Sequence, residues 1–131
     1  MKKLIALSLF YFTMSTSFSQ SPLLNYTEEQ LRNECHDSYF TTNYTKDGQR
    51  YLETQSDYLK TSYYFNKDGL TYLCIIKPLT QSELNYMIQS YNNIAVVIND
   101  TKWKLYTHNS IINITLWHIT DYFFTYDTLK N

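Results

Sequence analysis

Residues 63–78 have the sequence YYFNKDGLTYLCIIKP, and the rest of the chain can be arranged around this stretch. It begins with an aromatic run, continues with Asn-Lys-Asp-Gly and ends with an apolar run that stops at Pro78. Gly69 can adopt the positive φ that closes a tight turn, and proline is disfavoured inside a sheet. The stretch therefore predicts a β-hairpin with Asp68 and Gly69 in its turn.

The turn of this hairpin has a counterpart earlier in the chain. Lys46-Asp47-Gly48 is followed after two residues by Tyr-Leu, and the same pattern recurs from Lys67, 21 residues later. Two successive hairpins, which together make a four-stranded meander over about residues 38–78, explain this repeat. An Asp-rich turn can also bind calcium, but an EF-hand loop needs several more oxygen ligands at fixed spacing. We therefore predict a structural turn and no metal site.

Two helices are predicted from their N-terminal residues. Thr27 and Thr80 are good N-caps, and each is followed three residues later by Gln or Glu, as in a capping box. These signals predict helices over about residues 28–36 and 81–92. Apolar residues of the second helix recur at helical spacing, which favours packing on a core. They are Leu84, Met87, Ile88 and Tyr91.

The second half of the chain, from about residue 81, repeats the pattern of one helix followed by strands. Alternating apolar and polar residues predict four strands after the second helix. They cover about residues 94–98, 102–107, 110–117 and 122–126. The expected fold class is α+β: an antiparallel sheet from two helix-plus-β-meander units (α-ββββ-α-ββββ), with the helices packed on one face.

Residues 1–19 have the features of a secretory signal peptide. Lys2 and Lys3 precede an apolar run over residues 4–14, and small residues, Ser17 and Ser19, stand before the expected cleavage point. A membrane anchor is the alternative, but the run is shorter than the roughly 20 residues that a span needs. We expect residues 20–131 to form a single domain, without a later membrane span, that is periplasmic or secreted.

The composition limits the kinds of partner. The whole chain has a net charge of −1, and cleavage after residue 19 would remove two lysines and no acidic residue, leaving −3. No basic stripe is present, so nucleic acid is not an expected partner. The 14 tyrosines, against only two glycines and two prolines, favour strands over disorder.

The tyrosines allow two interpretations. They can fill half-buried sheet positions with the ring inward and the hydroxyl in water, or they can form an aromatic binding face. If such a face exists, the sequence favours five strand aromatics for it. These are Tyr51, Tyr63, Tyr72, Trp103 and Tyr122.

Cys35 and Cys74 also have two interpretations. In an oxidising compartment they can form a disulfide, which would close a loop of about 40 residues and add roughly 4 kcal/mol of stability. The alternative is two separate buried thiols that pack as small apolar side chains.

No catalytic, cofactor or metal site is predicted. The triplet Cys35-His36-Asp37 suggests nucleophilic chemistry, but neighbours on a helix point about 100° apart, so this cysteine and histidine do not meet. Glu53 and Asp57 are candidates for a carboxylate pair only because they lie at strand ends. The zinc-binding spacings CxxC and HxxxH are absent from the sequence, and both glycines are used in turns.

Two resemblances add to these expectations. The Phe-Ser-Gln ending of the leader and the combination of residues 63–69, Cys74, Trp103 and Tyr122-Phe123-Phe124 resemble small exported proteins of Bacteroidetes with no assigned function. This resemblance implies secretion and a single domain. The expected order of elements is similar to the tandem arrangement of the β-lactamase-inhibitory protein and PepSY class.

The function expected from the sequence is binding without catalysis. A protein-binding module, such as an inhibitor or an immunity-like protein, best fits export, aromatic strands and the lack of a catalytic motif. A small-ligand or glycan binder is the alternative, and a small hydrolase that uses Cys35 or an acid pair is a third hypothesis. The oligomeric state stays open.

Overall fold

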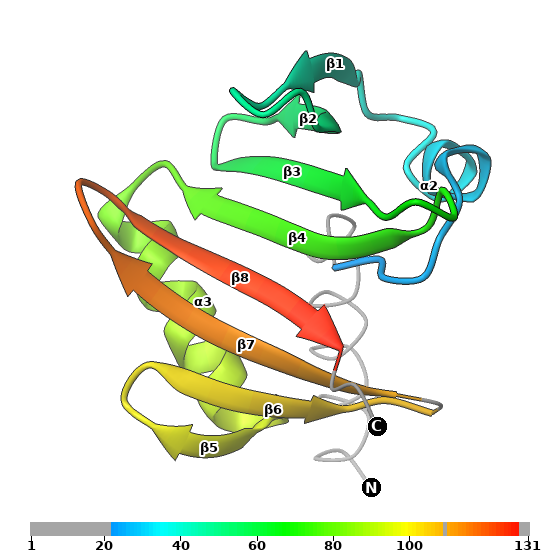
Figure 1. Cartoon of the computed structure of the whole chain (residues 1–131). Coiled ribbons are helices and arrows are strands. Elements are labelled where there is room, and N and C mark those ends of the chain that lie inside the picture. The colour runs from blue at the N-terminus through cyan, green and yellow to red at the C-terminus, as the bar shows by residue number, and fades with distance from the viewer. Residues whose placement is uncertain (1–21, 109, 129–131) are drawn as a thin grey trace, which may run out of the picture.

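The computed structural model describes residues 22–108 and 110–128 (Figure 1). Two helices and eight strands lie in this part of the chain, and all the strands belong to one antiparallel sheet. The expected α+β class with an antiparallel sheet is therefore confirmed. The predicted signal peptide lies outside the described residues.

The elements follow one another along the chain as one helix, four strands, a second helix and four more strands. The first five are α2 (Glu28–Glu34), β1 (Thr41–Tyr44), β2 (Arg50–Gln55), β3 (Leu59–Phe65) and β4 (Thr71–Pro78). The next five are α3 (Gln81–Ile94), β5 (Val96–Asn99), β6 (Lys102–Tyr106), β7 (Ile111–His118) and β8 (Tyr122–Thr128). The sheet order is β1-β2-β3-β4-β8-β7-β6-β5, so the two sets of four strands meet where β4 pairs with β8.

The hairpin predicted from residues 63–78 is confirmed as β3 and β4. Its turn is held by Asn66, whose Oδ1 accepts hydrogen bonds from the backbone N–H groups of Asp68 and Leu70. Gly69 has a φ of 78°, a region that residues with a Cβ avoid. The turn chemistry in the sequence therefore fixes where β3 ends and β4 begins.

Both predicted helix starts are confirmed, and both ends differ by a few residues. Thr27 and Gln30 form a capping box, and Thr80 Oγ1 accepts from the Glu83 N–H at 3.1 Å. Helix α2 ends at Glu34, with Cys35 as its C-cap, instead of continuing to residue 36. Helix α3 continues to Ile94, which was expected in a strand. The C-caps are Cys35 and Ala95, so neither end has the glycine that marks many helix C-termini in a sequence.

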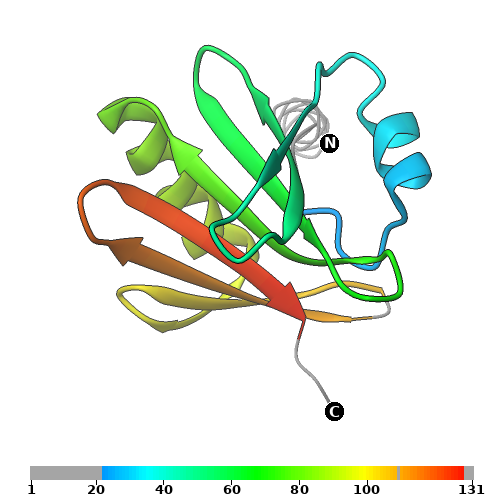
Figure 2. The ribbon, with the colours of Figure 1, turned by 45° about the horizontal axis from the view of Figure 1, so that its top comes forward.

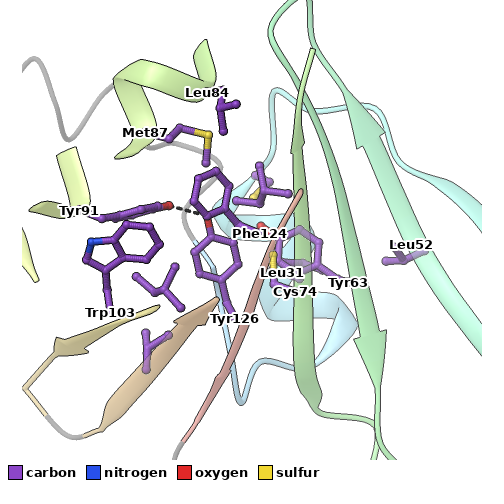
Figure 3. Close-up of a cluster of buried hydrophobic side chains, with 14 of the residues drawn as sticks. Leu31, Leu52, Tyr63, Cys74, Leu84, Met87, Tyr91, Trp103, Phe124 and Tyr126 are labelled. Atoms are coloured by element: carbon purple, nitrogen blue, oxygen red, sulfur yellow. Dashed lines mark hydrogen bonds between the residues drawn. The ribbon is translucent and has the colours of Figure 1, made fainter. Parts of the chain in front are cut away.

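One face of the sheet carries the core. Tyr63 pairs with Cys74, Cys74 with Tyr126 and Tyr126 with Ile114, so these four side chains lie in one row on the same face, and all are fully buried. Side chains of both helices belong to the same core cluster (Figure 3). They are Leu31 from α2 and Leu84, Met87 and Tyr91 from α3.

Aromatic side chains fill the centre of this core. The ring of Tyr91 contacts those of Trp103, Phe124 and Tyr126, and the hydroxyls of Tyr91 and Tyr126 are hydrogen bonded (Figure 3). Burial is the main cause that raises the pKa of both phenols. The two hydroxyls stay neutral and satisfy one another, which limits the cost of burying polar atoms.

The opposite face of the sheet, called here the open face, carries no described helix. In Figure 1, β7 and β8 pass in front of α3, and the turned view of Figure 2 shows α2 and α3 well apart from one another. Side chains on the open face alternate with the core residues along each strand. Neither described helix has the length and apolar character needed to cross a membrane.

Candidate functional site: a groove on the open face

The open face is hollowed by a groove of about 420 Å³ over β2, β3, β4 and the start of β8. The turn between β7 and β8 forms one rim of the groove. The lining consists of aromatic and aliphatic side chains with charged residues around them. The residues are Tyr51, Glu53, Lys60, Ser62, Tyr64, Ile75, Lys77, Ile119, Thr120, Asp121 and Phe123.

Strand register places the groove residues side by side. Tyr51 is opposite Tyr64, and Glu53 is opposite Ser62. Lys60 is opposite Lys77 on the next pair of strands. Because side chains alternate between the two faces, all of these residues project to the open face.

Two tyrosine rings form the aromatic wall of the groove. Tyr51 and Tyr64 stack with ring centroids 4.8 Å apart and an interplanar angle of 22°. Burial, and then the neighbouring Tyr51, Glu53 and Tyr72, raise the pKa of the Tyr64 phenol. Tyr72 therefore belongs to the same neighbourhood, and its hydroxyl accepts a hydrogen bond from Gln49 Nε2 at 2.7 Å. The raised pKa keeps the Tyr64 phenol of this wall neutral.

The charged groups of the groove form two ion pairs. Lys77 Nζ donates to Asp121 Oδ2 at 2.8 Å, and this hydrogen bond lowers the pKa of the Asp121 carboxyl. Lys60 Nζ lies 3.7 Å from Glu53 Oε1, too far for a hydrogen bond. The other carboxylate oxygen of Glu53 accepts from Ser62 Oγ at 3.3 Å. The first pair fixes the β7–β8 turn against β4.

The predicted aromatic binding face is divided between the two sides of the sheet. Tyr51 lines the groove, and Tyr72 lies beside it. Tyr63 and Trp103 are buried in the core, with 0% and 2% of their surface exposed. Tyr122 stacks on His118 at the end of the β7–β8 hairpin, with centroids 4.0 Å apart. Tyr63 pairs with Leu52, the neighbour of Tyr51, so the strand register places Tyr51 and Tyr63 on opposite faces of the sheet.

The two cysteines do not form a disulfide. Both are buried in the core cluster, in agreement with the alternative of two buried thiols. Burial is the main cause that raises the pKa of each thiol, and the shift is larger for the fully buried Cys74. Thiols held in the neutral form are poor nucleophiles.

The Cys35-His36-Asp37 triplet is not arranged for nucleophilic catalysis. His36 Nε2 lies 3.4 Å from Asp37 Oδ1, and both of these side chains are largely exposed, whereas Cys35 is buried. The imidazole and the thiol therefore lie in different environments. Within residues 22–108 and 110–128, no group of three or more His, Cys, Asp or Glu side chains could hold a metal ion.

The sequence did not single out most residues of the groove. The sequence indicates Tyr64, Lys77 and Phe123 only as members of strands, and it does not single out Lys60. Asp121 is a turn residue 44 positions after its partner Lys77. The available signal was the turn at residues 66–69, but the turn alone does not place Lys60 opposite Lys77. That pairing also needs the β-bulge between Tyr64 and Phe65, which shifts the register. The contribution of the β7–β8 turn depends on the pairing of β4 with β8, which no local pattern encodes.

No protein-family model, curated protein or solved structure matches the chain. The resemblances to exported Bacteroidetes proteins and to the β-lactamase-inhibitory protein and PepSY class therefore stay predictions. The site has to be interpreted from its own geometry.

Proposed function

We propose that this chain is a non-catalytic, exported binding protein that holds a partner protein on the open face of its sheet. The groove at Tyr51, Tyr64 and Phe123 is the observation that supports this proposal. Protein interfaces commonly have an aromatic, partly buried centre with a polar rim, and the groove has this composition. An inhibitor or an immunity-like protein is the form of this function that we favour.

The division of the chain into two helix-plus-meander units belongs to the same proposal. It is supported by the element order and by the sheet order, in which each set of four strands stays together. With this division, most of the groove lies on the strands of the first unit, and the second unit supplies residues 119–121 of the rim and Phe123 on β8. A partner seated there would contact both units.

Affinity capture with matched variants tests the function. The full chain would serve as bait in extracellular and periplasmic extracts, and the affinity of any stoichiometric partner would then be measured by calorimetry. We expect Tyr64→Ser to weaken the complex at least about tenfold, as truncation of an aromatic anchor does.

Tyr106→Ser is the control, because Tyr106 is exposed on β6, away from the groove. Equal affinities for the two variants, with both folded by circular dichroism, would contradict a binding site in the groove.

A small-ligand or glycan binder is the second candidate. The volume of the groove, about 420 Å³, falls within the range of about 300–1,000 Å³ typical of small-molecule sites, and stacked tyrosines suit sugar rings. A thermal-shift screen with cell-wall fragments tests this alternative. A saturable rise in melting temperature that Tyr64→Ser abolishes and Tyr106→Ser keeps would favour it over a protein partner.

A further inference from the structure

Two lysines face one another in the floor of the groove. Lys60 on β3 and Lys77 on β4 are directly opposite in the register, and both line the groove. Side chains directly opposite on one face have Cβ atoms about 4.5–5.5 Å apart, and like charges at such positions lower stability. This like-charge contact has a cost for the fold, although each lysine also has an acidic partner, Glu53 or Asp121.

The two ammonium groups are not equally neutralised. Lys77 is hydrogen bonded to Asp121 at 2.8 Å. The ammonium group of Lys60 lies 3.7 Å from Glu53 and makes no hydrogen bond with any described residue. Glu53 is itself engaged by Ser62. The groove thus presents one ammonium group, that of Lys60, whose donors are available to a ligand, beside a second ammonium group that is already paired with Asp121.

Apolar side chains around the two lysines would strengthen their attraction for a bound anionic group. The Tyr51–Tyr64 stack, Ile75 and Phe123 line the same groove, and a bound partner would exclude water from it. Charge interactions become stronger when water is excluded. Across β2, β3, β4 and the β7–β8 turn, the charges run negative, positive, positive, negative and sum to zero, so an anionic group finds cationic partners only in the middle, between Lys60 and Lys77.

We propose that the groove binds an acidic peptide segment of the partner, with an Asp or Glu carboxylate seated between Lys60 and Lys77. Apolar side chains next to that acidic residue would contact the Tyr51–Tyr64 wall and Phe123. This inference rests on the proposed function and names the chemistry of the protein that the open face recognises.

Fluorescence anisotropy with two defined peptides tests the inference. One probe is fluorescein-labelled Gly-Leu-Glu-Phe-Glu-Leu-Gly, and the matched probe has Gln in place of both Glu residues. We expect saturable binding of the Glu peptide that weakens with added salt, and binding of the Gln peptide that is at least about fivefold weaker. Absence of saturable binding, or equal binding of the two peptides, would overturn the proposal.

Variants of the chain provide the second arm. Lys60→Gln is expected to weaken binding of the Glu peptide about fivefold, whereas Lys102→Gln, an exposed lysine on β6 outside the groove, should leave it unchanged. The melting temperature of Lys60→Gln should change little, because relief of the like-charge contact with Lys77 offsets the loss of the long, partly exposed ion pair with Glu53. Two results would contradict the assigned role of Lys60. One is an equal effect of the two substitutions on the affinity for the peptide, and the other is a weaker affinity of Lys60→Gln that is accompanied by a lower melting temperature.

The remaining outcomes separate this inference from the function on which it rests. If Tyr64→Ser abolishes partner capture and Lys60→Gln does not affect it, the open face is a binding site but not one selective for acidic segments. If neither substitution affects capture, the proposed function itself fails. Binding of an oligogalacturonate together with no binding of the Glu peptide would replace the peptide by an acidic glycan and overturn the proposal.

Discussion

At the scale of single residues, Thr61 is the clearest weakness of the core. Its side chain is fully buried, and within the described part of the chain its Oγ1 has no hydrogen-bond partner. A buried hydroxyl without a partner loses its hydration and gains nothing in return. Thr61→Val keeps the branched shape, so we expect the free energy of unfolding to rise by about 1 kcal/mol, as measured by urea denaturation.

Thr61→Ala is the matched comparison, because it removes the hydroxyl together with the methyl group. This variant should be less stable than Thr61→Val, since a small cavity replaces the side chain. If Thr61→Val destabilises the protein as much as Thr61→Ala does, the hydroxyl contributes to stability and the prediction is wrong.

The two cysteines lead to a second prediction at this scale. Both thiols are buried, and burial raises the pKa of each, so the reactive thiolate is scarce and shielded. We expect Ellman's reagent to label neither Cys35 nor Cys74 appreciably in the folded protein at pH 8, and to label both once the protein is unfolded in guanidinium. Rapid labelling of one thiol in the folded state would contradict this and would reopen the hydrolase hypothesis.

Tyr63 and Tyr64 show what the sequence could and could not predict about single residues. Both were predictable as strand residues, because they precede a turn closed by Asn66 and Gly69. Which of the two faces the core depends on the side of the sheet that the helices cover, and two adjacent aromatics leave the alternation ambiguous. Tertiary packing buries Tyr63 completely and places Tyr64 in the groove.

At the scale of elements, helix α2 is short and is held to the sheet by a salt bridge as well as by its core residue Leu31. Glu28 Oε1 lies 2.7 Å from Arg50 on β2, and Glu28 Oε2 lies 3.0 Å from Arg32 one turn further along the helix. Burial alone would raise the pKa of the Glu28 carboxyl, but the two guanidinium groups outweigh it and lower the pKa. The charged form of Glu28 therefore helps to attach α2.

The sign of this shift gives a pH-dependent prediction. A carboxyl whose pKa is lower in the folded state stabilises the fold above its unfolded pKa, and the contribution is lost as the pH falls through the folded value. At pH 7 we expect Glu28→Gln to lower the free energy of unfolding by about 0.5 kcal/mol, a small effect because the carboxylate is about one third exposed. The difference from the wild type should shrink as the pH falls through the lowered pKa of the Glu28 carboxyl.

Glu29→Gln is the control for this measurement, because Glu29 has no salt bridge among the described residues. Urea denaturation at a series of pH values should give nearly the same stability for Glu29→Gln and the wild type. A Glu28→Gln deficit that stays constant from pH 7 to about pH 3 would show that packing, and not charge, attaches the helix.

Strand β5 leads to another prediction at this scale. It is an edge of the sheet, and its three apolar residues Val96, Val97 and Ile98 are each about 50% exposed. An exposed apolar edge is a site of association between chains. Val96→Glu places a carboxylate opposite Lys104 and should slow aggregation during refolding, as followed by light scattering, with little change in melting temperature. Val96→Thr, which adds no charge, should aggregate faster than Val96→Glu.

Elements were more predictable than their ends. The Thr-capped starts of α2 and α3 and the turn-closed hairpin between β3 and β4 depend on side-chain to backbone hydrogen bonds within a few residues, which the sequence encodes locally. The end of α2 at Glu34 and the extension of α3 to Ile94 each differ by two residues from the predicted ends. Neither C-cap has a neighbouring glycine, so the sequence lacks the local signal that marks many helix ends.

At the scale of the whole molecule, the groove depends on a contact that no local pattern encodes. Its rim residue Asp121 reaches Lys77 because β8 pairs with β4 in the middle of the sheet. The sequence predicted a sheet and its aromatic strands. It did not predict that the two sets of strands meet at β4 and β8, and so it could not place the β7–β8 turn over the first set.

The same junction predicts how the molecule unfolds. One core cluster continues from Leu52 on β2, through Cys74 and Tyr126, to Trp103 on β6, so the two sets of strands should lose their structure together. Leu52→Ala removes a fully buried side chain and should lower the free energy of unfolding by about 2–5 kcal/mol. The midpoints of the urea transitions followed by tryptophan fluorescence and by far-UV circular dichroism should then fall by the same amount. This holds although both tryptophans lie on the other set of strands.

Tyr44→Ala on β1 is the control for this experiment, because Tyr44 is largely exposed and its loss should shift neither signal appreciably. If the two sets of strands unfolded separately, Leu52→Ala would lower the midpoint of the circular dichroism transition and leave the midpoint of the tryptophan fluorescence transition unchanged. That outcome would mean that each set of four strands with its helix is stable alone. A groove whose floor and rim come from different sets would then close and open as the sets associate, whereas a single transition keeps its shape fixed.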